Sequence, residues 1–196
     1  MAALLSLSTQ AKAEVKTGTQ QVSLDMGFAN PLGNDTVFDQ TRTFGSPGPE
    51  IGLQYRYQIQ NNLSFGGDLS IASLGTNDFN TGKGPVEVKS AAWTLLAIGR
   101  MDLLPENDIR PYGLLGLGFG GVRRSTSFSQ NPALSSTESS GGGALALGGG
   151  VDFDVNKAWL VGGELRYTYI NTSLSQVGAS SSRTLDFLLK IGYKFL

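Results

Sequence analysis

The side chains that could do chemistry in this chain are carboxylates, guanidiniums and amines, because the sequence contains neither histidine nor cysteine. Without histidine, the commonest general base and the commonest transition-metal ligand are missing. Without cysteine, disulfides, thiol catalysis and thiolate metal sites are excluded. A net charge of −1 gives no basic footprint for nucleic acid. The composition therefore excludes serine–histidine and thiol mechanisms and leaves only carboxylate chemistry open to an enzyme. We expect a protein that is not an enzyme, holds no cofactor or metal, and has no nucleic-acid partner.

The charged residues follow a period of two. In the clearest example, Glu164 and Arg166 fall on one face of an extended segment, while Leu165, Tyr167 and Tyr169 fall on the other. Eight stretches of this kind follow one another along the chain, separated by glycine-, serine- and asparagine-containing connections. The pattern predicts an all-β domain of eight antiparallel strands joined up and down.

Two architectures fit such strands. A water-soluble sandwich or a lipocalin-like barrel would bury the apolar face in a core, whereas a transmembrane barrel would turn that face to lipid. The connections favour the second, because short ones (60–62, 104–109, 154–158) alternate with long ones (30–48, 75–85, 123–142, 171–182). Outer-membrane barrels pair short periplasmic turns with long extracellular loops. We therefore expect an eight-stranded transmembrane barrel whose strands are about 9–11 residues long, with both termini in the periplasm.

In this barrel the charged face lines the lumen. Both signs are present there, and isolated charges in a narrow lumen would be costly, so we expect ion pairs across strands that plug the interior. An alternative role for Glu164, Arg166 and Arg100 is a gate whose salt bridges exchange partners. The residues assigned to this lumen charge network are Arg56, Asp68, Arg100, Asp102, Asp152, Glu164, Arg166, Asp186 and Lys190.

Aromatic residues gather toward both ends of the predicted strands. Rings at the two membrane–water boundaries form interfacial girdles in outer-membrane barrels. The alternative is that these rings are ordinary core aromatics of a soluble barrel. The residues assigned to the girdles are Tyr57, Trp93, Tyr112, Trp159, Tyr167, Tyr169, Tyr193 and Phe195.

Two local motifs need separate interpretation. Residues 116–121 formally match the dinucleotide-binding pattern G-x-G-x-x-G, but a serine-rich segment follows where that motif requires a helix, so the glycines more simply serve the curvature of the sheet. Residues 1–13 combine a short apolar run with Ala-Lys-Ala before Glu14, which predicts the remnant of a signal peptide lacking its basic start; the alternative is a disordered tail. Residues 14–196 then form the barrel domain.

Three segments, 109–118, 145–153 and 160–167, resemble the small eight-stranded outer-membrane barrels of Gram-negative bacteria, the group that includes the OmpA transmembrane domain, OmpX and the opacity-type porins. The chain end is similar to the assembly signal of that group in Gly192, Tyr193 and Phe195, although it finishes in Leu196 instead of phenylalanine. Residues 167–169, 171–175 and 184–186 partly resemble the OmpW branch of narrow conduits for small hydrophobic compounds.

The resemblance implies an integral protein of the bacterial outer membrane, monomeric and inserted by the barrel-assembly machinery. Its partners would be outer-membrane lipid and lipopolysaccharide. We expect a largely plugged lumen and a role in envelope integrity or in surface interaction through the extracellular loops. The alternative is a narrow conduit for small, hydrophobic solutes of the OmpW or porin type.

Overall fold

The computed structural model describes residues 16–32, 34–37, 40–43, 46–81, 84–128, 133, 135–174 and 179–195, with side chains described outside 33–45, 79–84 and 173–180. The predicted signal-peptide remnant, residues 1–13, lies outside the described residues and stays a prediction. No helix in the described part of the chain is long and apolar enough to cross a membrane.

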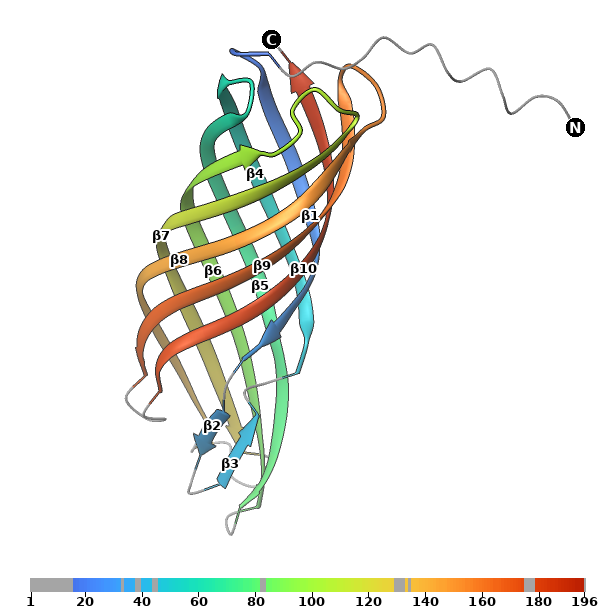
Figure 1. Ribbon diagram of the computed structural model, residues 1–196. Helices are drawn as coiled ribbons and strands as arrows, with labels where there is room; N and C mark the ends of the chain where they lie inside the picture. The colour runs from blue at the N-terminus through green and yellow to red at the C-terminus, as the bar shows by residue number, and fades with distance from the viewer. Residues whose placement is uncertain are drawn as a thin grey trace, which may run out of the picture.

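The chain forms a closed antiparallel barrel whose strands follow one another around the wall in the order β1, β10, β9, β8, β7, β6, β5, β4 (Figure 1). This confirms the predicted eight-stranded up-and-down barrel. The ring closes between β1 and β10, where Leu24 pairs with Ile191. The strands are β1 (Gln20–Pro31), β2 (Asn34–Val37), β3 (Gln40–Thr43), β4 (Gly48–Gln60), β5 (Leu63–Thr81), β6 (Gly84–Asp102), β7 (Ile109–Phe128), β8 (Ser136–Asp154), β9 (Trp159–Leu174) and β10 (Ala179–Phe195).

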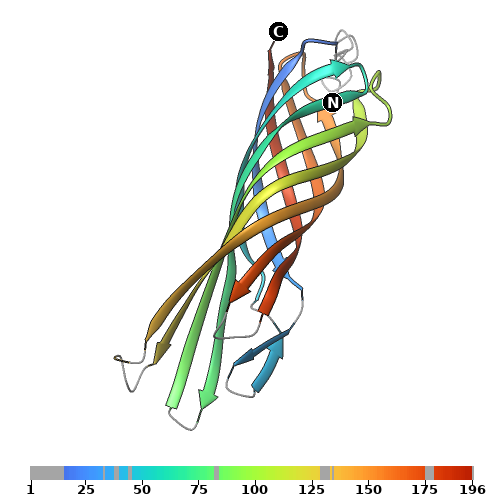
Figure 2. The same ribbon diagram turned by 90° about the vertical axis from the view of Figure 1, so that its left-hand side faces the viewer.

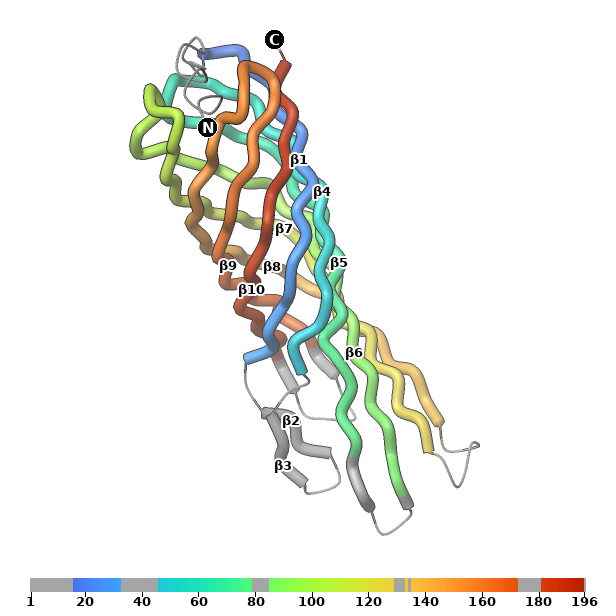
Figure 3. Tube along the Cα trace, turned by 90° about the vertical axis from the view of Figure 1, so that its right-hand side faces the viewer, coloured from blue at the N-terminus to red at the C-terminus, as the bar shows by residue number. Residues whose placement is uncertain are grey.

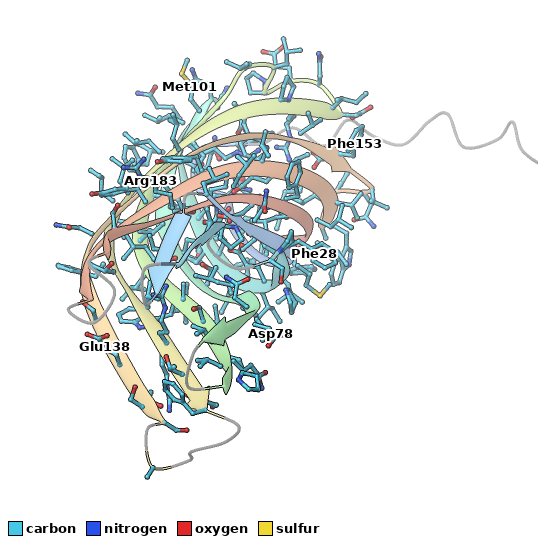
Figure 4. The ribbon with its side chains drawn as sticks, turned by 90° about the horizontal axis from the view of Figure 1, so that it is seen from below. Phe28, Asp78, Met101, Glu138, Phe153 and Arg183 are labelled. Carbon is cyan, nitrogen blue, oxygen red and sulfur yellow. The ribbon has the colours of Figure 1, made fainter. Side chains whose placement is uncertain are left out.

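The wall of the barrel is apolar on the outside and charged on the inside. Leu189 is 72% exposed and Phe119 is 67% exposed, whereas Arg100 and Arg166 on the inner face are each 2% exposed. Viewed along the barrel, Phe28, Met101 and Phe153 project away from the wall (Figure 4). This distribution is the inverse of a water-soluble protein and suits a barrel surrounded by hydrocarbon.

The two rims of the barrel differ. One rim, which we call the terminal rim, carries the start of β1 and the end of β10, where Gln20 pairs with Phe195 (Figure 1). At the opposite rim, which we call the hairpin rim, β5–β6 and β7–β8 extend well past the other strands (Figures 2 and 3). The small sheet of β2 and β3 also lies at this rim.

Several strands are longer than the sequence predicted. β7 has 20 residues, and β5, β6 and β8 have 19 each. Much of the connections expected at 75–85 and 123–142 is therefore strand, because cross-strand pairing continues as far as Thr81 with Gly84 and Thr126 with Ser136. The connection expected at 30–48 contains β2 and β3, which pair only with each other.

Candidate functional site: the lumen ion-pair network

The terminal half of the lumen is filled by ion pairs, beginning with a cluster around Arg100 on β6. Nε of Arg100 donates a 2.8 Å hydrogen bond to Oδ1 of Asp102, and its Nη1 lies 2.7 Å from Oδ2 of Asp152 on β8. The same oxygen of Asp152 accepts a 3.5 Å hydrogen bond from Nη2 of Arg56 on β4. Asp152 thus joins guanidiniums from two different parts of the wall, which holds β4, β6 and β8 together through the interior.

A smaller cluster lies at the terminal rim itself. Nη2 of Arg110 on β7 donates a 2.7 Å hydrogen bond to Oδ1 of Asp154 on β8. The amine of Lys194 on β10 lies 2.9 Å from the other oxygen of Asp154. The carboxylate of Asp154 on β8 therefore contacts β7 and β10, and it links three strands that begin or end at this rim.

Deeper in the lumen a third cluster surrounds Arg166 on β9. Its two Nη atoms each donate a 3.1 Å hydrogen bond to Asp68 on β5, one to each carboxylate oxygen. Its Nε donates a 2.7 Å hydrogen bond to Oε1 of Glu164. The amine of Lys190 on β10 donates a 2.8 Å hydrogen bond to the other oxygen of Glu164. Paired, charge-assisted hydrogen bonds of this kind are the strong ones in a low-dielectric interior.

Tyr112 on β7 connects the cluster around Arg100 with the cluster around Arg166. Its hydroxyl donates a 2.7 Å hydrogen bond to Oε2 of Glu164 and accepts one of 3.1 Å from Lys190. The guanidinium carbon of Arg100 lies 3.5 Å from the centre of the Tyr112 ring, a cation–π contact. Gly150 on β8 leaves the space for this ring, because a Cβ there would stand 2.6 Å from the Tyr112 hydroxyl.

The prediction that Tyr112 belongs to an interfacial girdle is wrong, because the residue is only 4% exposed and points into the lumen. The alternation of inward-facing and outward-facing positions along β7 indicates the correct orientation of Tyr112. Leu115 and Leu117 face outward and are exposed, so position 112 must face inward. The polar neighbours already described satisfy its hydroxyl, which a buried tyrosine requires.

The residues predicted for the lumen charge network are all buried on the inner face of the wall. The structure brings all of them except Asp186 into the two clusters around Arg100 and Arg166. Asp186 stands apart toward the hairpin rim, where the hydroxyl of Thr168 donates a 2.8 Å hydrogen bond to its Oδ2. We call the connected set the lumen network; it comprises Arg56, Asp68, Arg100, Asp102, Tyr112, Asp152, Glu164, Arg166 and Lys190.

Sequence reasoning missed several inward-facing polar residues, among them Gln54, Arg110 and Glu50. Gln54 joins the deeper cluster, since its amide nitrogen lies 3.3 Å from Oδ2 of Asp68. Arg110 pairs with Asp154 at the terminal rim. Glu50 faces the lumen and is 5% exposed. Each lies on the inward-facing phase of its strand, so applying the same period to every position of the strand would have found it.

The other residues predicted for the girdles lie on the outside of the wall. Near the terminal rim, Trp159 and Tyr193 pack edge to face with ring centres 5.1 Å apart, and Tyr193 stacks on Phe195 at 6.2 Å. Tyr57 is exposed on the adjoining wall, and Trp93 is exposed farther toward the hairpin rim. Tyr167 and Tyr169 are half-buried on the outer face of β9.

The residues of the predicted assembly signal lie on the strand that closes the barrel. Tyr193 and Phe195 face outward, and Gly192 faces inward against the side chain of Leu160. Their placement on β10 next to β1 puts them at the seam where the two ends of the sheet pair.

The charged groups of this site stabilise the barrel through ion pairs between strands. Among the described residues no group of three or more carboxylates is arranged to hold a metal ion. The carboxylates of Asp68, Asp152 and Glu164 instead contact guanidiniums or an amine. Removing one partner of such a buried pair leaves an uncompensated charge, so the network fixes the positions of the strands that carry it.

The chain is similar to known outer-membrane proteins in fold. It matches the structure of Ail, the attachment invasion locus protein of Yersinia pestis, with a TM-score of 0.59 at 18% identity, over 92% of this chain and 100% of that one. OprG of Pseudomonas aeruginosa matches with a TM-score of 0.57 at 19% identity, over 94% of this chain and 99% of that one. A major outer membrane protein of Thermus thermophilus matches with a TM-score of 0.60 at 12% identity, over 91% of this chain and 99% of that one.

A search of curated proteins finds no match to this chain. The family described as "Outer membrane protein beta-barrel domain" matches residues 1–195, nearly the whole sequence. The inverted wall and the polar, ion-paired lumen are the physical properties that such a membrane barrel requires. The chain therefore belongs to the outer membrane protein beta-barrel domain family.

Proposed function

We propose that this protein is a closed outer-membrane barrel that acts through its surface and does not conduct solutes. The observation that carries this proposal is the lumen network, in which ion pairs reach across the interior from β4, β5, β6, β8, β9 and β10. An eight-stranded barrel has an interior that side chains can fill completely. The hairpin rim then becomes the part of the molecule available for interaction with other molecules.

For the orientation, we infer that the terminal rim faces the periplasm and that the hairpin rim faces the outside of the cell. The terminal rim carries the connections 61–62, 103–108 and 155–158, whereas at the hairpin rim the β5–β6 and β7–β8 hairpins extend past the other strands (Figure 3). In outer-membrane barrels, short turns face the periplasm and longer loops face outward. The barrel-assembly machinery would then act on β10, and the folded protein would be a monomer.

The partner that we infer for the outer wall is lipopolysaccharide. Arg123 is exposed and lies two residues after Gly121, which pairs with Trp93 on the neighbouring strand. Arg183 is also exposed, and its guanidinium carbon lies 5.9 Å from the centre of the Tyr169 ring. Guanidiniums next to interfacial rings suit phosphate groups at the membrane surface. Ail, which shares the fold, has been solved with the heparin analogue sucrose octasulfate, so an anionic ligand is compatible with this architecture.

Planar-bilayer recording tests the closed barrel. The wild-type protein should show no defined unitary steps. As a positive control, the double variant Glu164→Ala with Arg166→Ala removes one acid and one base, so the net charge is unchanged. It also removes their ion pairs with Lys190 and Asp68 and empties part of the lumen, so it should conduct. Defined steps from the wild-type protein would contradict the proposal.

A second candidate function is a conduit for small hydrophobic compounds. It is favoured by an apolar groove of about 710 Å³ on the outer wall, where β4, β1, β10 and β9 meet. Met26, Phe28, Phe187 and Leu189 line this groove, and Gly163 contributes no side chain to it. An apolar solute leaving a barrel sideways would meet such a surface before it reached lipid. Gly163→Trp would fill the groove, so uptake of a hydrophobic fluorescent probe by cells should fall only if this candidate is right.

A further inference from the structure

The lumen contains a small cavity on the hairpin side of the lumen network. On each strand that lines the cavity, the lining residues lie closer to the hairpin rim than the residues of the lumen network do. On β5, for example, Ser70 lies closer to that rim than Asp68. The cavity has a volume of about 20 Å³, which is enough for one water molecule or one bare ion. Its lining residues are Glu50, Ser70, Ala72, Ala92, Thr94, Thr168, Ile170, Ser182, Thr184 and Asp186.

Two carboxylates in this lining have oxygens without a hydrogen-bond donor. Glu50 is 5% exposed and Asp186 is 1% exposed. Among the described residues, no donor reaches Oε2 of Glu50 or Oδ1 of Asp186, although Thr168 donates to the second oxygen of Asp186. A buried carboxylate oxygen without a partner is costly, so its persistence at a cavity points to a ligand that supplies positive charge.

The charge of the surrounding lumen leads to the same conclusion. Near the terminal rim, Asp102, Asp152 and Asp154 are matched by nearby arginines and Lys194. In the deeper part, the donors of Arg166 and Lys190 are directed at Asp68 and Glu164. Glu50 and Asp186 add further negative charge there, and no arginine or lysine lines the cavity. Positive charge is therefore in deficit at this level of the barrel.

We propose that the cavity binds one small monovalent cation, of the size of sodium, between the carboxylates of Glu50 and Asp186. Carboxylate and hydroxyl oxygens are the ligands of hard cations, and the serine and threonine hydroxyls of the lining are of that type. Magnesium usually keeps several bound waters, and a cavity of this volume does not accommodate them. One monovalent cation would offset one of the two negative charges of Glu50 and Asp186, whether or not the barrel conducts.

The test is the thermal unfolding midpoint of the folded full-length protein in detergent, measured in sodium chloride and in choline chloride at equal ionic strength. Choline is too large for the cavity, so it controls for screening. Sodium should raise the wild-type midpoint by on the order of 3 °C for a tenfold excess over its dissociation constant, because a ligand that binds only the folded state stabilises it. Glu50→Gln and Asp186→Asn should abolish that difference between the two salts.

Glu87→Gln is the matched control, since it removes an exposed carboxylate at the hairpin rim that pairs with Lys89. This variant should keep the wild-type response to sodium. Equal wild-type midpoints in the two salts would overturn the proposal, even if a variant failed to fold. A wild-type protein stabilised by acidification but indifferent to sodium would also overturn it, because the carboxylates would then hold a proton in place of a cation.

Discussion

The hydroxyl of Tyr112 on β7 donates a 2.7 Å hydrogen bond to Oε2 of Glu164 on β9, two strands away along the wall. The same carboxylate oxygen accepts a 2.8 Å hydrogen bond from Lys190. With Arg100 against its ring, Tyr112 contacts both clusters of the lumen network. The consequence is a mechanical link between the two clusters, which can be tested one residue at a time.

Tyr112→Phe should destabilise the barrel while keeping the ring in place. The substitution removes a buried hydroxyl that serves Glu164 and Lys190, and a hydrogen bond to a charged group contributes about 1.5–3 kcal/mol. We expect a loss of this size in the free energy of unfolding, measured by urea titration of the protein refolded in lipid vesicles. Tyr167→Phe makes the same chemical change on the outer face, and its effect should be within about 0.5 kcal/mol. Equal losses from the two variants would contradict the assigned role.

Gly150→Val should disrupt the position of Tyr112. A Cβ at residue 150 would stand 2.6 Å from the Tyr112 hydroxyl and would also collide with the carbonyl oxygen of Gly163. Because one of these contacts is with backbone, the strand itself must shift, and we expect destabilisation of about 2 kcal/mol or more. The loss of the folded band on an unheated electrophoresis gel measures it.

Gly113→Ala is the control for that substitution. Gly113 lies on the neighbouring strand, and a Cβ there would meet no described atom within 4 Å. The folded band should therefore persist. A tolerated valine at position 150 would mean that the ring of Tyr112 does not need the space.

Asp152→Asn should be among the most harmful single changes in the lumen. Asp152 lies 2.7 Å from Arg100 and also accepts a hydrogen bond from Arg56, so the variant leaves two buried guanidiniums without their shared counter-charge. Removal of one partner from a buried ion pair costs about 3–5 kcal/mol. The midpoint of urea unfolding should fall accordingly. Glu106→Gln, in the connection at the terminal rim, should leave it unchanged because that residue lies outside the network.

Phe195→Ala should separate assembly in cells from stability in vitro. The side chain is 38% exposed at the end of β10 and contributes a stacked contact with Tyr193 to the packing of the rim. If Phe195 belongs to an assembly signal, the amount of folded protein in outer-membrane fractions should fall several-fold, while refolding of purified protein in detergent stays nearly normal. A parallel fall in both measurements would assign the residue to stability alone.

The position of Tyr112 marks the boundary between what the sequence predicts and what it leaves open. The alternation of its strand, with Leu115 and Leu117 outside, already requires Tyr112 to face inward. An aromatic type near a strand end does not by itself indicate an interfacial position, because the phase of the strand decides which way the ring points. Nothing in the sequence indicated its hydrogen-bond partner, because Glu164 follows it by 52 residues.

The sequence by itself determined the two faces of each strand and the number of strands in the barrel. The physical reason is that side chains alternate with a period of two, so the residue types at alternate positions state which face is apolar and which is charged. The alternation runs from Val22 on β1 to Tyr193 on β10 with local interruptions, as at residues 120–122 of β7, which are all buried.

Only the tertiary structure decided which charges meet. Arg166 and Asp68 are 98 residues apart, and their contact depends on the tilt and stagger of all the strands that separate them around the ring. The lengths of the β5–β6 and β7–β8 hairpins and the cavity beside Glu50 were likewise decided by the tertiary structure. They depend on pairing and closure over the whole sheet, and no single stretch of sequence encodes them.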